Sequence, residues 1–307
     1  MLCVRKQDQA SFMDKLFMLF VIGLIFFSMP RVSISGQSTI VEVEGYSCMG
    51  DDKSRKDTKN EAIASAKRNA SESVATHIQS ETTVKDFELK KDLVEAYSRS
   101  QVKVISLKEI GWYKDVNSGD CFKVQLKAEV VPDAKIADKL KNIDTSSDDP
   151  LSPLHVRLWI DKSTYHANDK IKIFIKGNKP FYARIIYKDV AGSILQLLPN
   201  PQRDQTYFNG GTIYEIPTNE DKFDLTVSPP FGKESIAAYA STSPLGDIDT
   251  KPGGGVYQIS TAPSEIGIRT KGVIISDKKL TPQSASEKNR INSSEFYENA
   301  VELLTEK

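Results

Sequence analysis

The chain of 307 residues contains three histidines and three cysteines, which leaves little material for metal binding or acid–base catalysis. Its 41 basic and 41 acidic residues cancel, so no overall basic field is present to hold a nucleic acid. The sequence also lacks a serine elbow, a Walker loop, a paired-histidine zinc motif and a CxxC pair. These absences disfavour an enzyme and a nucleic-acid partner, and no cofactor is expected.

The apolar run at residues 16–29 has an uncharged core of about 14 residues, which is short for a membrane helix of about 20. Basic residues before this run and small residues after it predict a secretory signal peptide over residues 1–35, cleaved after Ser35. The mature protein is then expected in the periplasm, without a stable membrane span. An N-terminal anchor that stays in the inner membrane is the alternative. The basic residues are Arg5, Lys6 and Lys15, and the small ones are Ser33, Ser35 and Gly36.

Residues 38–141 change their hydrophobic period in the way that is typical of a small α+β domain. Alternation at period 2 predicts strands, and a long stretch with apolar residues on one helical face predicts a helix between them. A second, weaker helical pattern follows the first. The predicted order is strand, long helix, strand, strand, that is β-α-β-β, at residues 40–46, 54–80, 101–113 and 122–130, with the weaker helical pattern at 86–99.

Removal of the signal peptide leaves two cysteines, Cys48 and Cys121, and export to an oxidising compartment predicts one disulfide between them. The strand order brings both to the same end of the sheet. A bridge there closes a loop of roughly 70 residues and contributes about 4 kcal/mol on the chain-entropy model. One observation argues against it: Cys121 shares the polar face of its strand, so the two Cβ vectors need not converge.

The first region carries the opening Val41-x-Val43-x-Gly45-Tyr46, an alanine-rich helix and a closing strand from Cys121 to Val130. In these features it resembles the N-terminal domain of the flagellar assembly protein T family and the related small outer-membrane lipoprotein domains. The resemblance implies an envelope-assembly setting, with flagellar or secretion-type proteins as partners. It implies no activity.

Residues 142–153 are polar, carry no apolar period and predict an exposed linker. Residues 154–307 then predict an antiparallel β-sandwich with a C-terminal extension, because short strands alternate with turn-rich connections. Within the extension, 266–275 predicts a strand, and 295–304 suits either a helix or a closing strand. The sandwich strands are predicted at 154–160, 170–176, 181–188, 193–198, 212–217, 223–228 and 234–241.

The motifs of this second region occur in a fixed order: Trp159-Ile160-Asp161-Lys162, Leu198-Pro199-Asn200, Tyr214-x-Ile216-Pro217 and Pro229-Pro230-Phe231-Gly232-x-Glu234. In them the region resembles the bacterial Domain of Unknown Function 4384. That resemblance implies a compact, immunoglobulin-like β-domain used for interaction, and it carries over no catalytic residue.

His155, Arg157 and Trp159 alternate on the polar face of one predicted strand, and Phe231 is added to this candidate surface. An aromatic side chain beside arginine on an exposed face can bind a sugar or an extended peptide. The alternative is a strand face that the next loop covers. Asp161 and Asp169 fall at strand ends, where aspartate caps backbone donors, so a structural role is favoured over a catalytic pair.

Together these patterns predict a non-enzymatic periplasmic protein that acts as a protein-interaction or assembly module of the envelope. Its expected partners are envelope proteins, with the cell wall as a further candidate. The alternative functions are a carbohydrate- or cell-wall-binding module with Trp159 as its platform, and a cell-wall hydrolase that uses Asp161 and Asp169.

Overall fold

The computed structural model describes residues 36–81, 87–133, 148–253, 255–272 and 293–307. The predicted signal peptide at 1–35 and residues 142–147 of the predicted linker lie outside the described residues. The fold is α+β, with mostly antiparallel sheets, a few helices and a β-sandwich-like domain, as the sequence predicts. None of the helices in the described ranges combines the length and the apolar character that a membrane crossing requires.

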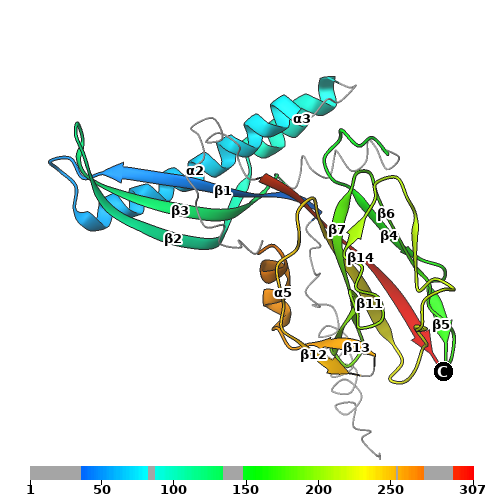
Figure 1. The fold of residues 1–307 in the computed structure, drawn as a ribbon. Coiled ribbons are helices and arrows are strands. Elements are labelled where there is room, and N and C mark those ends of the chain that lie inside the picture. The colour runs from blue at the N-terminus through cyan, green and yellow to red at the C-terminus, as the bar shows by residue number, and fades with distance from the viewer. Residues whose placement is uncertain (1–35, 82–86, 134–147, 254, 273–292) are drawn as a thin grey trace, which may run out of the picture. The chain divides into compact units, whose positions relative to one another are not determined.

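The N-terminal part is an antiparallel sheet with the order β1-β3-β2 and two helices (Figure 1). Apolar side chains on one face of β1 and β3 pack against the apolar face of α2. The alternation along the strands and the helical period of α2, both visible in the sequence, place these side chains on the facing surfaces. The elements are β1 (Gln37–Cys48), α2 (Arg55–Glu81), α3 (Phe87–Ser98), β2 (Gln101–Asp115) and β3 (Gly119–Val131). All five match predicted elements.

Small residues let α2 lie close to β1. Ala62 and Ala66 are fully buried on the helix, and Gly45 faces them from the strand. A Cβ at Gly45 would stand 2.4 Å from both the Ala62 carbonyl oxygen and the Ala66 amide nitrogen, which no side chain tolerates. Glycine at this position is therefore a packing requirement of the helix–sheet contact.

The C-terminal part packs a three-stranded sheet, β10-β6-β4, against strands of the larger sheet, and one apolar core lies between them. The three-stranded sheet consists of β4 (Val156–Ile160), β6 (Ile173–Gly177) and β10 (Tyr214–Ile216). The larger sheet contributes β5 (Thr164–His166), β7 (Phe181–Lys188), β8 (Ile194–Leu198), β9 (Tyr207–Phe208), β11 (Lys233–Ser241), β12 (Thr250–Gly253), β13 (Val256–Ile259) and β14 (Ser293–Glu306).

The segment left open as helix or strand, 295–304, belongs to a strand, β14. Its first residues pair with β1, where Ile40 lies opposite Ser294, and its middle pairs with β11, where Ala237 lies opposite Ala300. Strands of both regions therefore form one continuous sheet in the order β12-β13-β8-β7-β11-β14-β1-β3-β2, with β5 paired to β14 and β9 paired to β7. The predicted C-terminal extension supplies an interior strand of this sheet, and β1 of the first region lies beside it.

Two strand predictions are wrong. Residues 266–270 belong to helix α5 (Pro263–Thr270), in which Ile266 and Thr270, four residues apart, are the buried pair. Pro263 at the helix start and Glu265 in the first turn are helix-start signals that outweigh the alternation of isoleucines. Residues 223–228 form an extended segment with a single bridge, Lys170 to Thr226, because its backbone bonds to 168–171 do not extend into a ladder.

A candidate recognition surface on the β-sandwich

The outer face of the three-stranded sheet carries a stacked aromatic pair. Trp159 of β4 lies directly opposite Phe174 of β6, and their ring centroids are 5.5 Å apart at an interplanar angle of 15°. The guanidinium of Arg157, two residues before Trp159, lies 5.4 Å from the centroid of the indole ring. Alternation explains the arrangement, since Val156 and Leu158 point into the core and leave Arg157 and Trp159 on the other face. We call Arg157, Trp159 and Phe174 the aromatic cluster.

Charged side chains border the aromatic cluster on β6 and β10. Lys176 lies opposite Arg157 and forms an ion pair of 2.7 Å with Asp148. Glu215 lies opposite Phe174 and forms an ion pair of 2.6 Å with Lys172. Arg157 is exposed and makes no ion pair within the part of the chain that the structure describes. Its charge is therefore available to a carboxylate on a partner.

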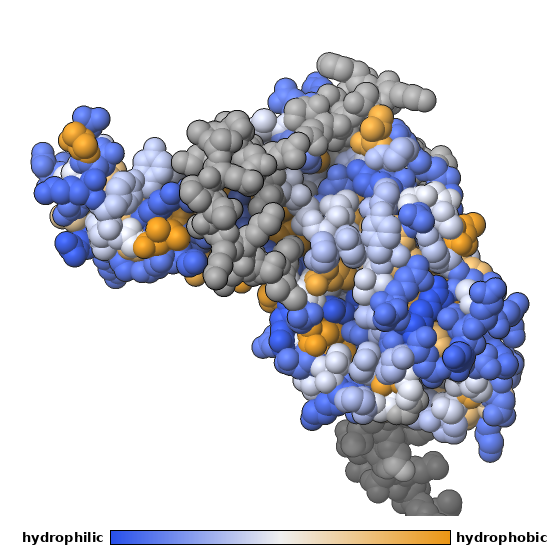
Figure 2. Space-filling view, viewed as in Figure 1, coloured by the Kyte–Doolittle hydropathy of each residue, from blue (hydrophilic) through white to orange (hydrophobic). Residues whose placement is uncertain are grey.

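Figure 2 shows the hydropathy of the side chains on one face of the molecule. Among its coloured residues, hydrophobic side chains form separate spots between hydrophilic ones. Scattered apolar residues of this kind are normal on a protein surface and mark no interface. A recognition surface is therefore better sought in specific side-chain geometry, such as the aromatic cluster, than in general hydrophobicity.

His155 and Phe231, which the sequence analysis grouped with Trp159, make other contacts. The imidazole of His155 packs edge-on against Tyr297 of β14, with centroids 4.9 Å apart. Phe231 is half-buried and packs against the sandwich core. Alternation holds only within a strand, and His155 precedes β4, which begins at Val156. Of the predicted surface residues, the structure therefore brings together Arg157 and Trp159, and it places Phe174 beside them.

Phe174 was missed as a candidate because the sequence analysis followed a single strand. The signal was present, since Phe174 is the one aromatic residue among the lysines of its polar face, Lys170, Lys172 and Lys176. What the sequence did not give is the register that puts it opposite Trp159. Cross-strand neighbours are the unit of contact on a sheet, and they depend on that register.

The two aspartates considered as a catalytic pair have structural partners. Asp161 Oδ1 accepts hydrogen bonds from the Tyr165 hydroxyl at 2.7 Å and from the Lys172 backbone N–H at 3.0 Å. Asp169 Oδ2 accepts from the His166 backbone N–H at 3.1 Å and the Lys162 ammonium at 3.3 Å. These bonds hold the pKa of Asp169 below its ordinary value, the His166 N–H contributing most. A carboxyl so held stays ionised and is a poor general acid.

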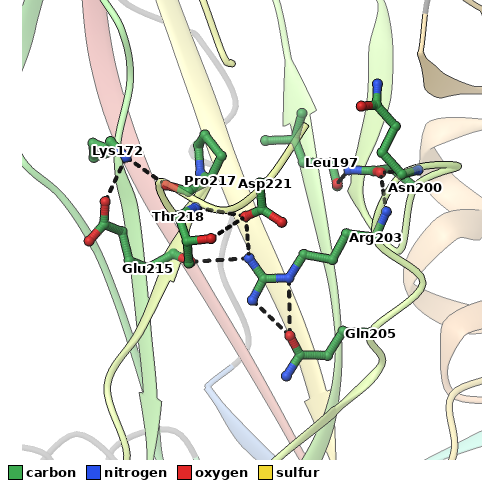
Figure 3. A network of polar contacts seen from close by, with 10 residues as sticks. Lys172, Leu197, Asn200, Arg203, Gln205, Glu215, Pro217, Thr218 and Asp221 are labelled. Carbon is green, nitrogen blue, oxygen red and sulfur yellow. Dashed lines mark hydrogen bonds and ion pairs between the residues drawn. The ribbon is translucent and has the colours of Figure 1, made fainter. Parts of the chain in front are cut away.

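A polar network joins the loops around β10 (Figure 3). Arg203 Nη1 lies 2.8 Å from Asp221 Oδ2, and its other nitrogens donate to the side-chain oxygen of Gln205. Asn200 Oδ1 accepts the backbone N–H of Arg203 at 2.8 Å, which closes the turn that presents the arginine. Lys172 Nζ donates to the Pro217 carbonyl oxygen at 2.7 Å. The network therefore fixes β10 beside β6 and holds Glu215 next to the aromatic cluster.

Burial alone would raise the pKa of Asp221, but the hydrogen bonds from Thr218 and the charge of Arg203 outweigh it, so the pKa lies below its ordinary value. The backbone N–H of Thr218 donates at 2.7 Å and its hydroxyl at 3.1 Å. Both partners of the Arg203–Asp221 pair are close to nine-tenths buried. The Arg203–Asp221 pair is therefore a structural ion pair, in which each buried charge is compensated by its partner and by neighbouring hydrogen bonds.

Cys48 and Cys121 lie directly opposite each other in the β1–β3 ladder, and the structure joins them with a disulfide. The register answers the objection drawn from strand parity. Residues that face each other across two antiparallel strands project to the same side of the sheet, so both Cβ atoms leave it on the face away from α2. The pairing of the two cysteines in the exported protein stays a prediction.

Within the described residues, no group of three or more histidine, cysteine, aspartate or glutamate side chains is arranged to hold a metal ion. The geometry around Arg157, Trp159 and Phe174 instead combines a flat apolar surface with an adjacent cation. An arrangement of this type can contact a partner protein through the aromatic ring edges and through charge-assisted hydrogen bonds to the cation.

The described residues thus combine a β-sandwich-like domain with an aromatic and cationic cluster on the outer face of its three-stranded sheet. Residues 164–244 match the family model described as Domain of unknown function (DUF4384). This range holds Phe174, Glu215 and the polar network, whereas Trp159 and Arg157 precede it. The match does not extend to residues 38–141, whose resemblance to envelope-assembly domains stays a prediction. No curated protein matches the chain.

Proposed function

We propose that the chain is a non-enzymatic protein of the periplasm that acts as an interaction or assembly module in the envelope. The observation that carries this proposal is the aromatic cluster, in which Arg157 and Phe174 both contact the ring of Trp159 on a strand face. Tryptophan and arginine are the residues most enriched among the hot spots of protein interfaces. The setting rests on the predicted signal peptide and on the resemblance of residues 38–141.

A protein partner is favoured over a sugar because other side chains of the protein already pack against the indole ring of Trp159. A sugar would stack flat on that ring, which already carries the phenyl ring of Phe174 and the guanidinium of Arg157. A partner protein needs no free ring face, because it can contact the ring edge and place a carboxylate on Arg157. Cell-wall binding through Trp159 remains the second candidate, and it predicts a different set of ligands.

The test is crosslinking in intact cells, with a photoreactive residue at position 157 and mass-spectrometric identification of the captured protein. A specific product from position 157, absent when the photoreactive residue is at Val190 on the β7–β8 turn, supports the proposal. In a second arm, Trp159→Ala should reduce this capture at least tenfold and leave the thermal unfolding midpoint close to that of wild type. Tyr207→Ala, which removes an exposed aromatic residue elsewhere on the sandwich, is the matched control.

Two further assays separate the alternatives. Co-sedimentation with purified cell-wall sacculi that disappears in Trp159→Ala, without any protein crosslink, would replace the proposal by the carbohydrate-binding candidate. Turnover of cell-wall material that Asp161→Asn abolishes at unchanged stability would establish the hydrolase. We expect neither, because Asp161 holds Tyr165 and the Lys172 backbone. We expect Asp161→Asn and Asp169→Asn instead to lower the free energy of unfolding by about 1 kcal/mol each.

A further inference from the structure

A cavity of about 210 Å³ lies in the sandwich, and its lining shares no residue with the aromatic cluster. Its walls come from the ends of β7, β8 and β11, with the extended segment 224–228 along its rim. Most of the lining is apolar. The apolar lining residues are Ile171, Leu195, Leu197, Leu225, Val227, Ile236 and Val256.

The carboxylate of Glu234 lines the inner part of this cavity, and the residue is 4% exposed. Its Oε1 accepts a hydrogen bond from the Thr305 hydroxyl at 3.2 Å, while Oε2 has no hydrogen-bond partner among the described residues. Tyr187, which also lines the cavity, lies against the same carboxylate: burial first, and then the interaction with Glu234, raise the pKa of its phenol. Glu234 is thus a buried acid with hydroxyl neighbours and no cation in an ion pair with it among the described residues.

The rim of the cavity is polar and carries a second carboxylate. Asp224, Thr226 and Ser228 alternate as exposed residues along the segment, while Val227 between them is buried. Asp224 lies 2.9 Å from Lys170 in an exposed ion pair, which is weak and easily exchanged. A cationic group that approaches the opening therefore meets a carboxylate at the rim first and a second one deeper inside.

The chemistry of the lining selects among cations. A metal ion of the calcium or magnesium type takes six or more oxygen ligands, and the leucine, isoleucine and valine walls supply none. A buried carboxylate surrounded by such walls is matched by an organic cation, whose charged head pairs with the acid while its apolar stem contacts the walls. A primary ammonium on a straight chain of four or so methylenes has the required form.

From this arrangement we infer that the cavity is a binding site for a primary alkylammonium group, which enters past Asp224 and pairs with Glu234. The side chain of a lysine on a partner protein and a free alkylamine present the same group. This site is separate from the aromatic cluster, so it stands or falls independently of the proposed function. Its lining, except for Val256, lies within the segment that matches the family model.

Binding is measured on the exported protein by methyl NMR of isoleucine, leucine and valine, with shifts followed at Ile171, Val227 and Ile236. The probes are n-pentylamine and Nα-acetyl-lysine N-methylamide. Their uncharged counterparts are 1-pentanol and Nα-acetyl-norleucine N-methylamide. Each amine should bind at least tenfold more tightly than its uncharged counterpart. If n-pentylamine alone binds, the ligand is a free amine; if the lysine derivative binds too, a protein-borne lysine fits.

Glu234→Gln keeps the shape of the side chain and removes its charge. In this variant the preference for amines should fall at least tenfold, while binding of 1-pentanol stays the same. Because a buried substitution can unfold the protein, Leu225→Trp provides a second test: it fills the cavity from the half-exposed segment and should abolish binding of both amines. The inference is overturned if amines and alcohols bind alike, if no probe binds wild type, or if either folded variant keeps the preference for amines.

Discussion

Lys271 Nζ lies 2.8 Å from Glu129 Oε1, and the two side chains are 8% and 5% exposed. Glu129 stands on β3, and Lys271 ends helix α5, so the pair fastens α5 to the N-terminal strands of the continuous sheet. The Ser38 hydroxyl donates to the same carboxylate oxygen at 2.7 Å, and the ammonium lies 4.8 Å from the centroid of Phe296 on β14. Elements from both halves of the sequence thus meet at one buried charge pair.

Removal of one partner should be costly here. Lys271→Met leaves Glu129 as an uncompensated buried charge, so the free energy of unfolding should fall by about 3–5 kcal/mol. The double variant Lys271→Met/Glu129→Met should recover much of this loss, because no isolated charge remains. Urea denaturation measures both. Lys170→Met, which breaks the exposed pair with Asp224, is the control, and it should lower the free energy of unfolding by at most about 1 kcal/mol. Equal losses of stability in Lys271→Met and Lys170→Met would contradict the prediction.

The disulfide predicts a dependence on oxidation state. Cys48 and Cys121 are separated by 73 positions, and closure of a loop of that length contributes about 4 kcal/mol on the chain-entropy model. The Cys48→Ser/Cys121→Ser variant should therefore unfold at lower urea concentration than the oxidised protein. Reduced wild type should resemble the variant. Peptide mapping without reductant should recover the linked peptides, and two free thiols in protein isolated from the periplasm would refute the bridge.

The Arg203–Asp221 pair predicts an acid-sensitive component of stability. The pKa of Asp221 lies below its ordinary value of 3.8, so the unfolded chain binds this proton more readily than the folded one. The contribution is present above that ordinary value and is lost as the pH falls through the lowered folded pKa. Unfolding experiments between pH 5 and the acid limit should show a shallower loss in Asp221→Asn than in wild type. Glu220→Gln, which removes an exposed charge from the same turn, should keep the wild-type slope.

Export predicts a defined N-terminus. If residues 1–35 are a signal peptide, the protein recovered from the periplasm begins at Gly36, because signal peptidase requires small residues before the cut. N-terminal sequencing or intact-mass measurement distinguishes this from the anchored alternative. Recovery of Met1 in membrane-bound protein would show that the anchor is retained.

Local patterns predicted most elements, because the determinants of those elements lie within the elements themselves. The alanine face of α2 and the alternation of β3 are examples, and both are correct. The strand prediction for residues 266–270 was wrong because two isoleucines at alternate positions satisfy a strand pattern. Pro263 and the four-residue spacing of Ile266 and Thr270 specify a helix instead. A short window cannot separate these periods when the capping signals are ignored.

The candidate surface and the cavity depended on information that no local window contains. Trp159 was identified from its own strand, but its partner Phe174 required the register between β4 and β6. Glu234 carried a sequence signal, since it shares the inward parity of Ile236 on β11, where a carboxylate is out of place. Its meaning as a cavity-lining acid appears only when Thr305 and segment 224–228 are brought to it from other parts of the chain.

The position of β14 at the C-terminal end of the chain and in the interior of the sheet affects how the protein folds during synthesis. Ile40 pairs with Ser294 across about 250 residues, a separation typical of slow, late closure. A chain that emerges N-terminus first exposes the edges of β1 and β11 until β14 is synthesised. A nonsense mutation between residues 241 and 293 would release a product that contains β1 and β11 but lacks β14, and the two unsatisfied strand edges readily pair with other chains. Loss of β14 would therefore create an aggregation hazard in addition to removing the full-length protein.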